Sequence, residues 1–440
     1  MAGRFFDVAV ITEGINGLIA AYELSKSDVS IVVIDNYKPS LDIDGYIFNY
    51  YPEHVFAYNE LPEILKELPV TFETYINPMY QLILPDRRVD IYSDIQKLMA
   101  AVELRFDRDE ASVLTEYLDK EKRLCELLPG LSRQVGYGIK IAGSVLRRLR
   151  LKQLLLKEKQ SANESFRRIA EHDRSRVFIN AIVRYLLPWV DDNRAFQGTC
   201  IAPLVIGKRF YPAGGMDSIK TALIKELQQR NVNIVQDKEV NSIDYEKYFT
   251  ITFDHEQSVR SRSIVSEPLY EKTLSLLPFD YSKIIKKQFY VDNIFVGLHR
   301  SCLPEIYDRV NNAVMVSDYN RPLANDNIIF IDSNPVSDIK RAKDEMAALT
   351  ITMPIKENSI SKISSIRQSV IERVKWFMPF FDEYVEHIYY TEPSILWNNT
   401  DAPVYRKGIM LLNDEFINMY TSDEKYAYIK KLAKRLISTL

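Results

Sequence analysis

Glycine is scarce in this sequence, and glycine decides how closely a backbone can approach a ligand. The chain has 14 glycines in 440 residues, about half the share that is usual in globular proteins. Flavin and nucleotide enzymes use glycine wherever backbone touches phosphate or a flavin ring, because a Cβ atom would block the approach. The shortage therefore argues against a tightly wrapped cofactor.

Other absences exclude further classes of protein. The three cysteines, Cys125, Cys200 and Cys302, are far apart and odd in number, which indicates a reducing compartment without a disulfide framework. The five histidines show no paired ligand spacing, so we expect no metal site. A net charge of -3 gives no reason to expect nucleic acid as a partner. Without a signal-like start or an apolar run near eighteen residues, we expect a cytoplasmic protein with no transmembrane segment.

The chain does contain a clear opening unit. Residues 5–35 read FFDVAVITEGINGLIAAYELSKSDVSIVVID. The pattern predicts a buried strand from Phe6 to Ile11 and a helix from about Ile15 to Ser25. A second buried strand, Ser30 to Ile34, is then followed by Asp35. This is the first βαβ unit of a dinucleotide-binding fold, in which the helix start faces a pyrophosphate and the acid binds a ribose hydroxyl.

The turn inside this unit keeps part of the G-x-G-x-x-G fingerprint. Gly14 and Gly17 stand at its second and third positions, and Asp35 follows at the expected spacing. The first position is Thr12, a β-branched residue for which the left-handed conformation of a tight turn is costly. Glu13 would bring a carboxylate near the phosphates, although an acid beside a helix start also stabilises the helix with no ligand. Nucleotide binding at this turn is left open.

Three later stretches carry a resemblance to a known family. They are DGYIFNYYPEHVF (residues 44–56), the stretch that begins RRVDIYSDIQKLMAA (87–124) and the stretch that begins KRFYPAGGMDSIKTA (208–246). In this order they resemble the flavin amine oxidase superfamily, particularly its phytoene desaturase and carotenoid isomerase branch. The resemblance covers nearly the whole chain.

The resemblance implies an α/β fold with two discontinuous domains. A Rossmann-like FAD/NAD(P)-binding domain would comprise residues 1–69, 210–283 and 397–440. A substrate domain with a mixed sheet and a helical lid would comprise residues 70–209 and 284–396. Strand and helix order also predicts that Asp35 ends a strand parallel to the first one, and that the strand from Ile409 to Asn413 joins the same domain.

Flavin enzymes of this family hold the cofactor through three glycine-based contacts. The first is the opening turn, with Gly14, Ile15, Gly17 and Asp35. The second, a glycine pair soon after the acid, is replaced by DNYKPSLDIDG (residues 35–45). In the third, near the C-terminus, Asn413 stands where the family has glycine, and a bulky run replaces the glycine-rich loop that follows.

The resemblance also implies two further cofactor residues, if FAD is bound. The backbone of Val240 would touch the adenine end, and Asp414 matches the acid of the C-terminal motif. No catalytic residue is assigned, because in this family flavin itself takes the hydride. No G-x-S-x-G elbow indicates a nucleophile either.

Two functions remain open. One is a degenerate, non-catalytic member of the fold that binds an apolar isoprenoid-like ligand or a protein partner. Rab GDP-dissociation inhibitors, in the wider fold, are a precedent because they bind a protein and its lipid without flavin. The other is a divergent FAD-dependent oxidoreductase resembling phytoene desaturase or carotenoid isomerase. Fold alone does not choose between them.

Two stretches bear on this choice. If flavin is absent, we expect Tyr50, Tyr51, Phe416 and Met419 to fill the cofactor cradle, the alternative being that they pack the core. The leucine-rich basic segment VLRRLRLKQLLLKEK (residues 145–159) is either a membrane-surface helix or a lid helix with a solvated charged surface. Its basic residues are spread around the helix, which favours the lid and leaves peripheral membrane contact open.

Overall fold

The computed structural model describes most of the chain. The described residues are 4–50, 55–57, 63–75, 80–92, 94–135, 164–186, 208–236, 238–253, 257–267, 275–278, 285–304, 312–343, 345–399, 405–406, 409–411, 430–431, 433–434 and 436–438. Within them, no helix is long and apolar enough to cross a membrane.

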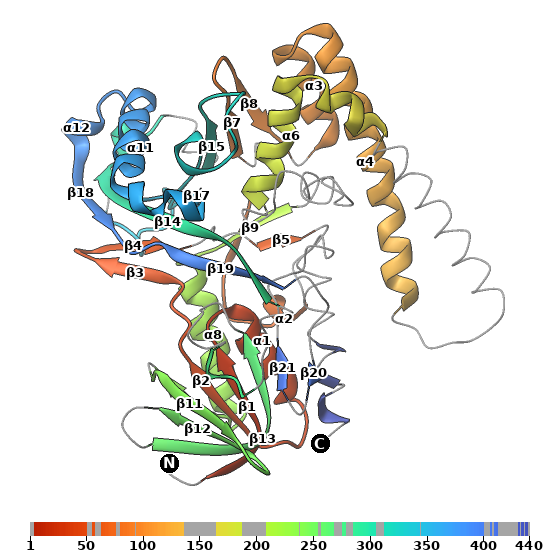
Figure 1. Cartoon of the computed structure of the whole chain (residues 1–440), viewed down its shortest axis with the longest axis vertical. Helices are drawn as coiled ribbons and strands as arrows, with labels where there is room; N and C mark the ends of the chain where they lie inside the picture. The colour runs from red at the N-terminus through yellow and green to blue at the C-terminus, as the bar shows by residue number, and fades with distance from the viewer. Residues whose placement is uncertain are drawn as a thin grey trace, which may run out of the picture.

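A largely parallel sheet forms the lower part of the molecule in Figure 1. Its strands run in the order β10 (Asn233–Gln236), β2 (Ile31–Asp35), β1 (Phe5–Thr12), β13 (Gln257–Glu267), β12 (Phe249–Phe253) and β11 (Val240–Tyr245). β21 (Ile409–Leu411) also pairs with β13, and β20 (Tyr405–Arg406) pairs with β21. β10, β2, β1, β13 and β21 are mutually parallel, whereas β11 and β12 join in an antiparallel way. This arrangement is the predicted nucleotide-binding type of sheet.

The opening unit forms as the sequence predicts. β1 and β2 are buried on both faces, as strands of a covered parallel sheet must be. α1 (Ile15–Leu24) and α8 (Gly215–Gln229) cover one face and share a buried cluster with Val8, Val10 and Val33. Both predictions about strand placement are confirmed: β2 ends at Asp35 parallel to β1, and β21 pairs with β13 in the same sheet.

The segment after Asp35 folds into a hairpin. β3 (Ser40–Ile43) and β4 (Tyr46–Asn49) form an antiparallel hairpin. Its two-residue turn is Asp44 and Gly45, at φ 53° and 85°, values that a tight hairpin turn of this kind requires. Downstream, α2 (Glu63–Lys66) is a short helix.

A second, mixed sheet forms the upper part of the molecule. Its order is β18 (Val385–Tyr390), β14 (Ile285–His299), β17 (Met346–Ile355), β16 (Ile328–Ser333), β15 (Asn312–Val316), β7 (Tyr80–Ile83) and β8 (Arg88–Ile91), and β19 (Ser394–Asn399) pairs with β14. Only β15 and β7 are parallel among these pairs in the described residues. A small third sheet has the order β5 (Val55–Ala57), β9 (Lys208–Pro212) and β6 (Phe72–Tyr75).

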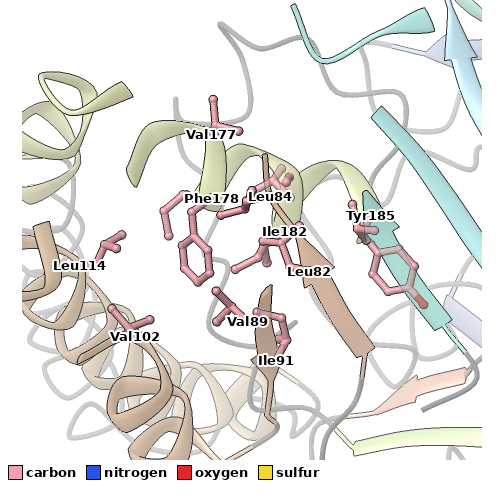
Figure 2. Packing of buried hydrophobic residues seen from close by; sticks show 14 of the residues in the cluster. Leu82, Leu84, Val89, Ile91, Val102, Leu114, Val177, Phe178, Ile182 and Tyr185 are labelled. Atoms are coloured by element: carbon pink, nitrogen blue, oxygen red, sulfur yellow. The ribbon is translucent and has the colours of Figure 1, made fainter. Parts of the chain in front are cut away.

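Helices cover both faces of the mixed sheet. α3 (Ile95–Arg105), α4 (Arg108–Val135) and α6 (Asp173–Leu186) lie on one face, where Phe178 and Ile182 pack on Leu82 and Ile91 (Figure 2). α11 (Ile363–Phe377) and α12 (Phe381–Tyr384) cover the other face. Neighbouring strand residues alternate between these two clusters, as side chains on a pleated sheet do. The leucine-rich basic segment of residues 145–159 lies outside the described residues.

The two large sheets are joined through Asp338, in the loop between β16 and β17. Its Oδ2 accepts hydrogen bonds from the Tyr211 hydroxyl at 2.6 Å and from the Gly214 N–H at 2.8 Å, at the start of α8. Gly214 has φ 84°, a left-handed conformation that favours glycine. Arg341, fully buried, donates from Nε to the Ile47 carbonyl at 3.0 Å. The loop between β16 and β17 is thus one of the contacts between the two large sheets.

Candidate functional site

The expected ligand crevice lies where β1 and β2 end and α1 begins. Gly14, the cap residue of α1, has φ -150° and ψ 179°, an extended conformation that any residue adopts. Gly17 has a steric reason to be glycine. A Cβ atom there would lie 2.5 Å from both the Cβ and the Oγ1 of Thr12, far inside van der Waals contact. Gly17 therefore serves the close packing of α1 against β1.

Thr12 behaves differently from the expectation. It remains in the extended strand β1 and does not adopt the left-handed conformation that is costly for a β-branched residue. Its side chain is fully buried, and its hydroxyl donates to the Gly14 carbonyl oxygen at 2.5 Å. The Thr12 side chain thus lies between β1 and α1, against Gly17, and its hydrogen bond to Gly14 stabilises the turn that joins them.

Asp35 is the acid that would bind a ribose, and its carboxylate already has partners. Its side chain is fully buried, and its Oδ1 accepts from the Tyr37 N–H at 3.1 Å. The Lys220 Nζ, from α8, lies 3.1 Å from Oδ2. Lys220 also donates to the Tyr37 carbonyl oxygen and lies 5.9 Å from the Tyr37 ring centroid. Sequence reasoning missed Lys220.

The start of α1 is covered as well. Glu13 is 4% exposed, Asn16 is 1% exposed and Gly14 is buried. A helix N-terminus favours negative charge, which in this fold a phosphate supplies. Here Glu13, an acidic residue directly before the cap, is buried at that place.

Of the remaining predicted cofactor residues, two pack in hydrophobic clusters and one lies outside the described residues. Ile15, the first residue of α1, packs against the cluster under α1 and α8. Val240 opens β11 and shares a buried cluster with Ile34, the neighbour of Asp35. Asp414, Tyr51, Phe416 and Met419 lie outside the described residues.

Tyr50 packs with an aromatic cluster under the β3–β4 hairpin. Its ring lies 5.6 Å from that of Phe295 on β14, and Phe48 lies 5.4 Å from the same ring. Burial raises the pKa of the Tyr50 hydroxyl. At Gly297, on β14, a Cβ would lie 2.8 Å from the Tyr46 ring. The hairpin therefore seals this part of the mixed sheet with aromatic side chains.

Two tyrosine hydroxyls of this aromatic cluster donate hydrogen bonds to carboxylates. Tyr46 donates to Glu386 Oε2 at 2.7 Å, and Tyr389 donates to Asp44. Burial, with the hydrogen bond to Glu386, raises the pKa of Tyr46 above its usual range. Both tyrosines thus stay protonated at neutral pH and act as hydrogen-bond donors rather than as bases.

The arrangement at the crevice does not fit a dinucleotide in the way that the resemblance implies. A ribose hydroxyl would have to displace Lys220 from Asp35, and a pyrophosphate would have to approach a buried carboxylate at Glu13. Leaving the Asp35 carboxylate or the Lys220 ammonium group without the other is costly, because both are largely buried. In the described part of the chain, no cluster of His, Cys, Asp or Glu could hold a metal ion.

No family model matches the sequence, and no curated protein does. Solved structures are similar over nearly their whole length. Putrescine oxidase bound to putrescine is 14% identical with a TM-score of 0.61, and 99% of each chain is covered. A Rab GDI from Plasmodium falciparum is 11% identical (TM-score 0.60, 98% of each chain). An oxidoreductase from Methanosarcina mazei is 13% identical (TM-score 0.59, 96% of this chain and 100% of that one). The chain therefore has the mixed α/β fold of FAD/NAD(P)-binding oxidoreductases, which a Rab GDI shares.

Proposed function

We propose that this chain is a non-catalytic member of the flavoenzyme fold that binds an apolar isoprenoid-like ligand or a protein partner. The observation that carries the proposal is the pair of Asp35 and Lys220, in which the ribose-binding acid is buried and joined to a lysine of α8. Thr12 and Glu13 support it, since one closes the turn and the other brings a buried carboxylate to the helix start. The similarity to a Rab GDI is consistent with a binding role.

The test is a flavin titration of the purified full-length protein. We expect no visible flavin absorbance after purification and a dissociation constant for FAD weaker than micromolar. Each lost or blocked contact costs on the order of 1 to 3 kcal/mol, so two or three of them weaken binding a hundredfold or more. Stoichiometric flavin in the purified protein, or micromolar binding, would contradict the proposal.

A variant sharpens the titration. Replacing Thr12 by Gly and Glu13 by Ala restores small residues at the turn. Because Asp35 would still be bonded to Lys220, we expect these two changes to leave the FAD affinity unaltered. A large gain in affinity would mean that only those two side chains keep the cofactor out, and that the crevice is otherwise open.

The second candidate is a divergent FAD-dependent oxidoreductase resembling phytoene desaturase or carotenoid isomerase. It is favoured by the retained β1–α1–β2 unit, with Gly14, Gly17 and Asp35 at the expected places. In that case the lysine would move away from Asp35 when the cofactor binds. The same titration separates the two candidates, because only this one predicts a bound flavin that is reduced by substrate.

A further inference from the structure

Three segments that are far apart in the sequence meet at the junction of the two large sheets. They are the stretch from Asp35 to the β3–β4 hairpin, the start of α8, and the loop between β16 and β17. Hydrogen bonds and an ion pair join each segment to the other two. We name these contacts the junction network, formed by Asp35, Tyr37, Ser40, Ile47, Tyr211, Gly214, Asp217, Lys220, Asp338 and Arg341.

α8 holds the first segment at two places within its first two turns. Ser40, which begins β3, donates a hydrogen bond to Asp217. One turn further along the helix, the Lys220 Nζ forms the ion pair with Asp35 and donates to the Tyr37 carbonyl oxygen. Because residues three apart are neighbours on a helix surface, a shift at the start of α8 reaches both contacts.

The start of α8 is capped from outside the helix. Its cap residue is Gly214, which has no side chain to offer. In a capping box, the side chain three residues after the cap accepts from the cap N–H. Here that residue is Asp217, whose carboxylate accepts from Ser40 instead. The acceptor for the Gly214 N–H is Asp338 Oδ2, at 2.8 Å, from the loop of the mixed sheet.

Asp338 is held in turn by buried neighbours. It is 5% exposed, and its Oδ2 also accepts from the Tyr211 hydroxyl at 2.6 Å. Arg341 donates from Nη1 to the same hydroxyl at 3.4 Å and from Nε to the Ile47 carbonyl oxygen. The Ile47 N–H donates back to the Arg341 carbonyl oxygen at 2.8 Å. Removing one member would leave other buried polar groups without a partner, so we expect the network to respond as a unit.

Apolar packing fixes the rest of α8 but not its first turn. Ile219, Leu223 and Leu227 are buried in the cluster under the parallel sheet, which holds the helix against β2. Helix ends fray more readily than helix centres. Lys220 has a long and flexible side chain, and keeping it in one conformation costs entropy. The ion pair with Asp35 therefore depends on a first turn that stays formed.

We propose that Asp338 is a positioning residue for Lys220, through which the mixed sheet keeps the crevice of the parallel sheet closed. It acts by completing the first turn of α8, so that Lys220 stays on Asp35. Without the bond to Gly214, the first turn frays and the lysine leaves the carboxylate. The inference rests on the proposed function in one respect, because it takes the pair of Asp35 and Lys220 as the feature that closes the crevice.

The first experiment follows the reactivity of the Lys220 amine in the full-length protein. A short pulse of sulfo-N-hydroxysuccinimide acetate labels accessible lysines, and peptide mass spectrometry reads the extent at each position. Lys225, exposed on the same helix, is the internal reference. In Asp338→Ala we expect Lys220 labelling to rise about tenfold relative to Lys225. In Asp338→Asn, which keeps one acceptor oxygen for Gly214, it should rise less than about threefold.

A control variant separates positioning from a general loss of stability. Phe377→Ala removes a buried ring of α11, outside the junction network, and destabilises the fold. It should leave the ratio of Lys220 to Lys225 labelling unchanged. Circular dichroism of each variant checks that the protein is folded under the labelling conditions.

A double-mutant cycle measures the same coupling without a reagent. Urea denaturation of the wild type, Asp338→Ala, Lys220→Met and the double variant gives four folding equilibrium constants. Independent substitutions multiply their effects within about twofold. Because the two residues act through one helix start, we expect the double variant to be destabilised about fivefold less than that product.

Three results would overturn the proposal. They are unchanged Lys220 labelling in Asp338→Ala, an equal rise in Phe377→Ala or in Asp338→Asn, and effects in the cycle that simply multiply. Both readouts are taken without added flavin. A failure of this inference therefore leaves the flavin titration unaffected, and the two failures can be told apart.

Discussion

The crevice of the parallel sheet and the outer end of α11 use their side chains in opposite ways. At the crevice, where this fold holds a ligand, Asp35 is buried and forms an ion pair with Lys220. The Thr12 hydroxyl there donates to the Gly14 carbonyl oxygen. At the end of α11, outside the crevice, Trp376 and Phe380 are exposed. The place where a fold usually holds its ligand therefore need not be the place where one member of that fold exposes side chains for binding.

The largest effect is expected at the crevice. Lys220→Met leaves the buried carboxylate of Asp35 without its cation, and breaking a buried pair in this way costs about 3 to 5 kcal/mol at pH 7. Urea denaturation measures the loss. Adding Asp35→Asn removes the unpaired charge, so the double variant should recover much of the stability. A loss under about 1 kcal/mol for the single variant would mean that Asp35 is solvated and free for a ligand.

Two neighbours at the end of α11 give a matched contrast. Phe377 is 3% exposed and packs in the core, with the Arg88 guanidinium 5.2 Å from its ring centroid. Phe377→Ala should cost about 3 to 5 kcal/mol of unfolding free energy. Trp376→Ala should change it by less than about 0.5 kcal/mol, because its ring is exposed. A large loss for Trp376→Ala would show that the tryptophan is part of the core, which would remove the contrast.

A smaller effect is expected at the packing of α1 on β1. Gly17→Ala places a Cβ 2.5 Å from Thr12 atoms, and overpacking of this kind costs about 1 to 3 kcal/mol. Thr12→Gly in the same chain removes the two side-chain atoms and leaves only the Cα at 3.1 Å, so the double variant should recover part of the stability that Gly17→Ala loses. If Thr12→Gly gives no rescue, the clash involves other atoms and our account of this turn is wrong.

The smallest effect concerns an exposed carboxylate. A hydrogen bond from the Arg87 guanidinium is the main cause that lowers the pKa of Asp86 from 3.8 to about 2. A depressed folded pKa gives stability that is present above pH 4 and is lost as the pH falls through 2. Because the side chain is 38% exposed, Asp86→Asn should cost less than about 1 kcal/mol at pH 7. Stability curves from pH 7 to pH 2 should show the two proteins converging in acid.

Local patterns predicted much of the fold. Buried strands around an amphipathic helix are set by neighbouring residues, so β1, α1 and β2 appear within a residue or two of their expected bounds. The sequence predicts a short strand over Tyr46–Asn49, which is β4, but β3 and the hairpin that joins the two strands were not predicted, although Asp44 and Gly45 between two alternating stretches are a strong hairpin signal.

The site was harder to predict, because its partners are distant in sequence. Lys220 reaches Asp35 only because α8 lies against β2 and β10, and no local pattern carries that information. The exposure of Trp376 could have been predicted. It lies two positions from Val374, about 200° around the helix, and so falls away from the face that Val370 and Val374 define.

The bond from Asp338 to the start of α8 has a consequence for how the protein folds. The helix receives this partner from a loop of the other large sheet, so its first turn is completed only after the two sheets have docked. Contacts that join segments so far apart in sequence form late, because the chain must first close a long loop. A contact made after the transition state leaves the folding rate unchanged and slows unfolding. We therefore expect Asp338 to govern how long the folded molecule lasts rather than how fast it forms.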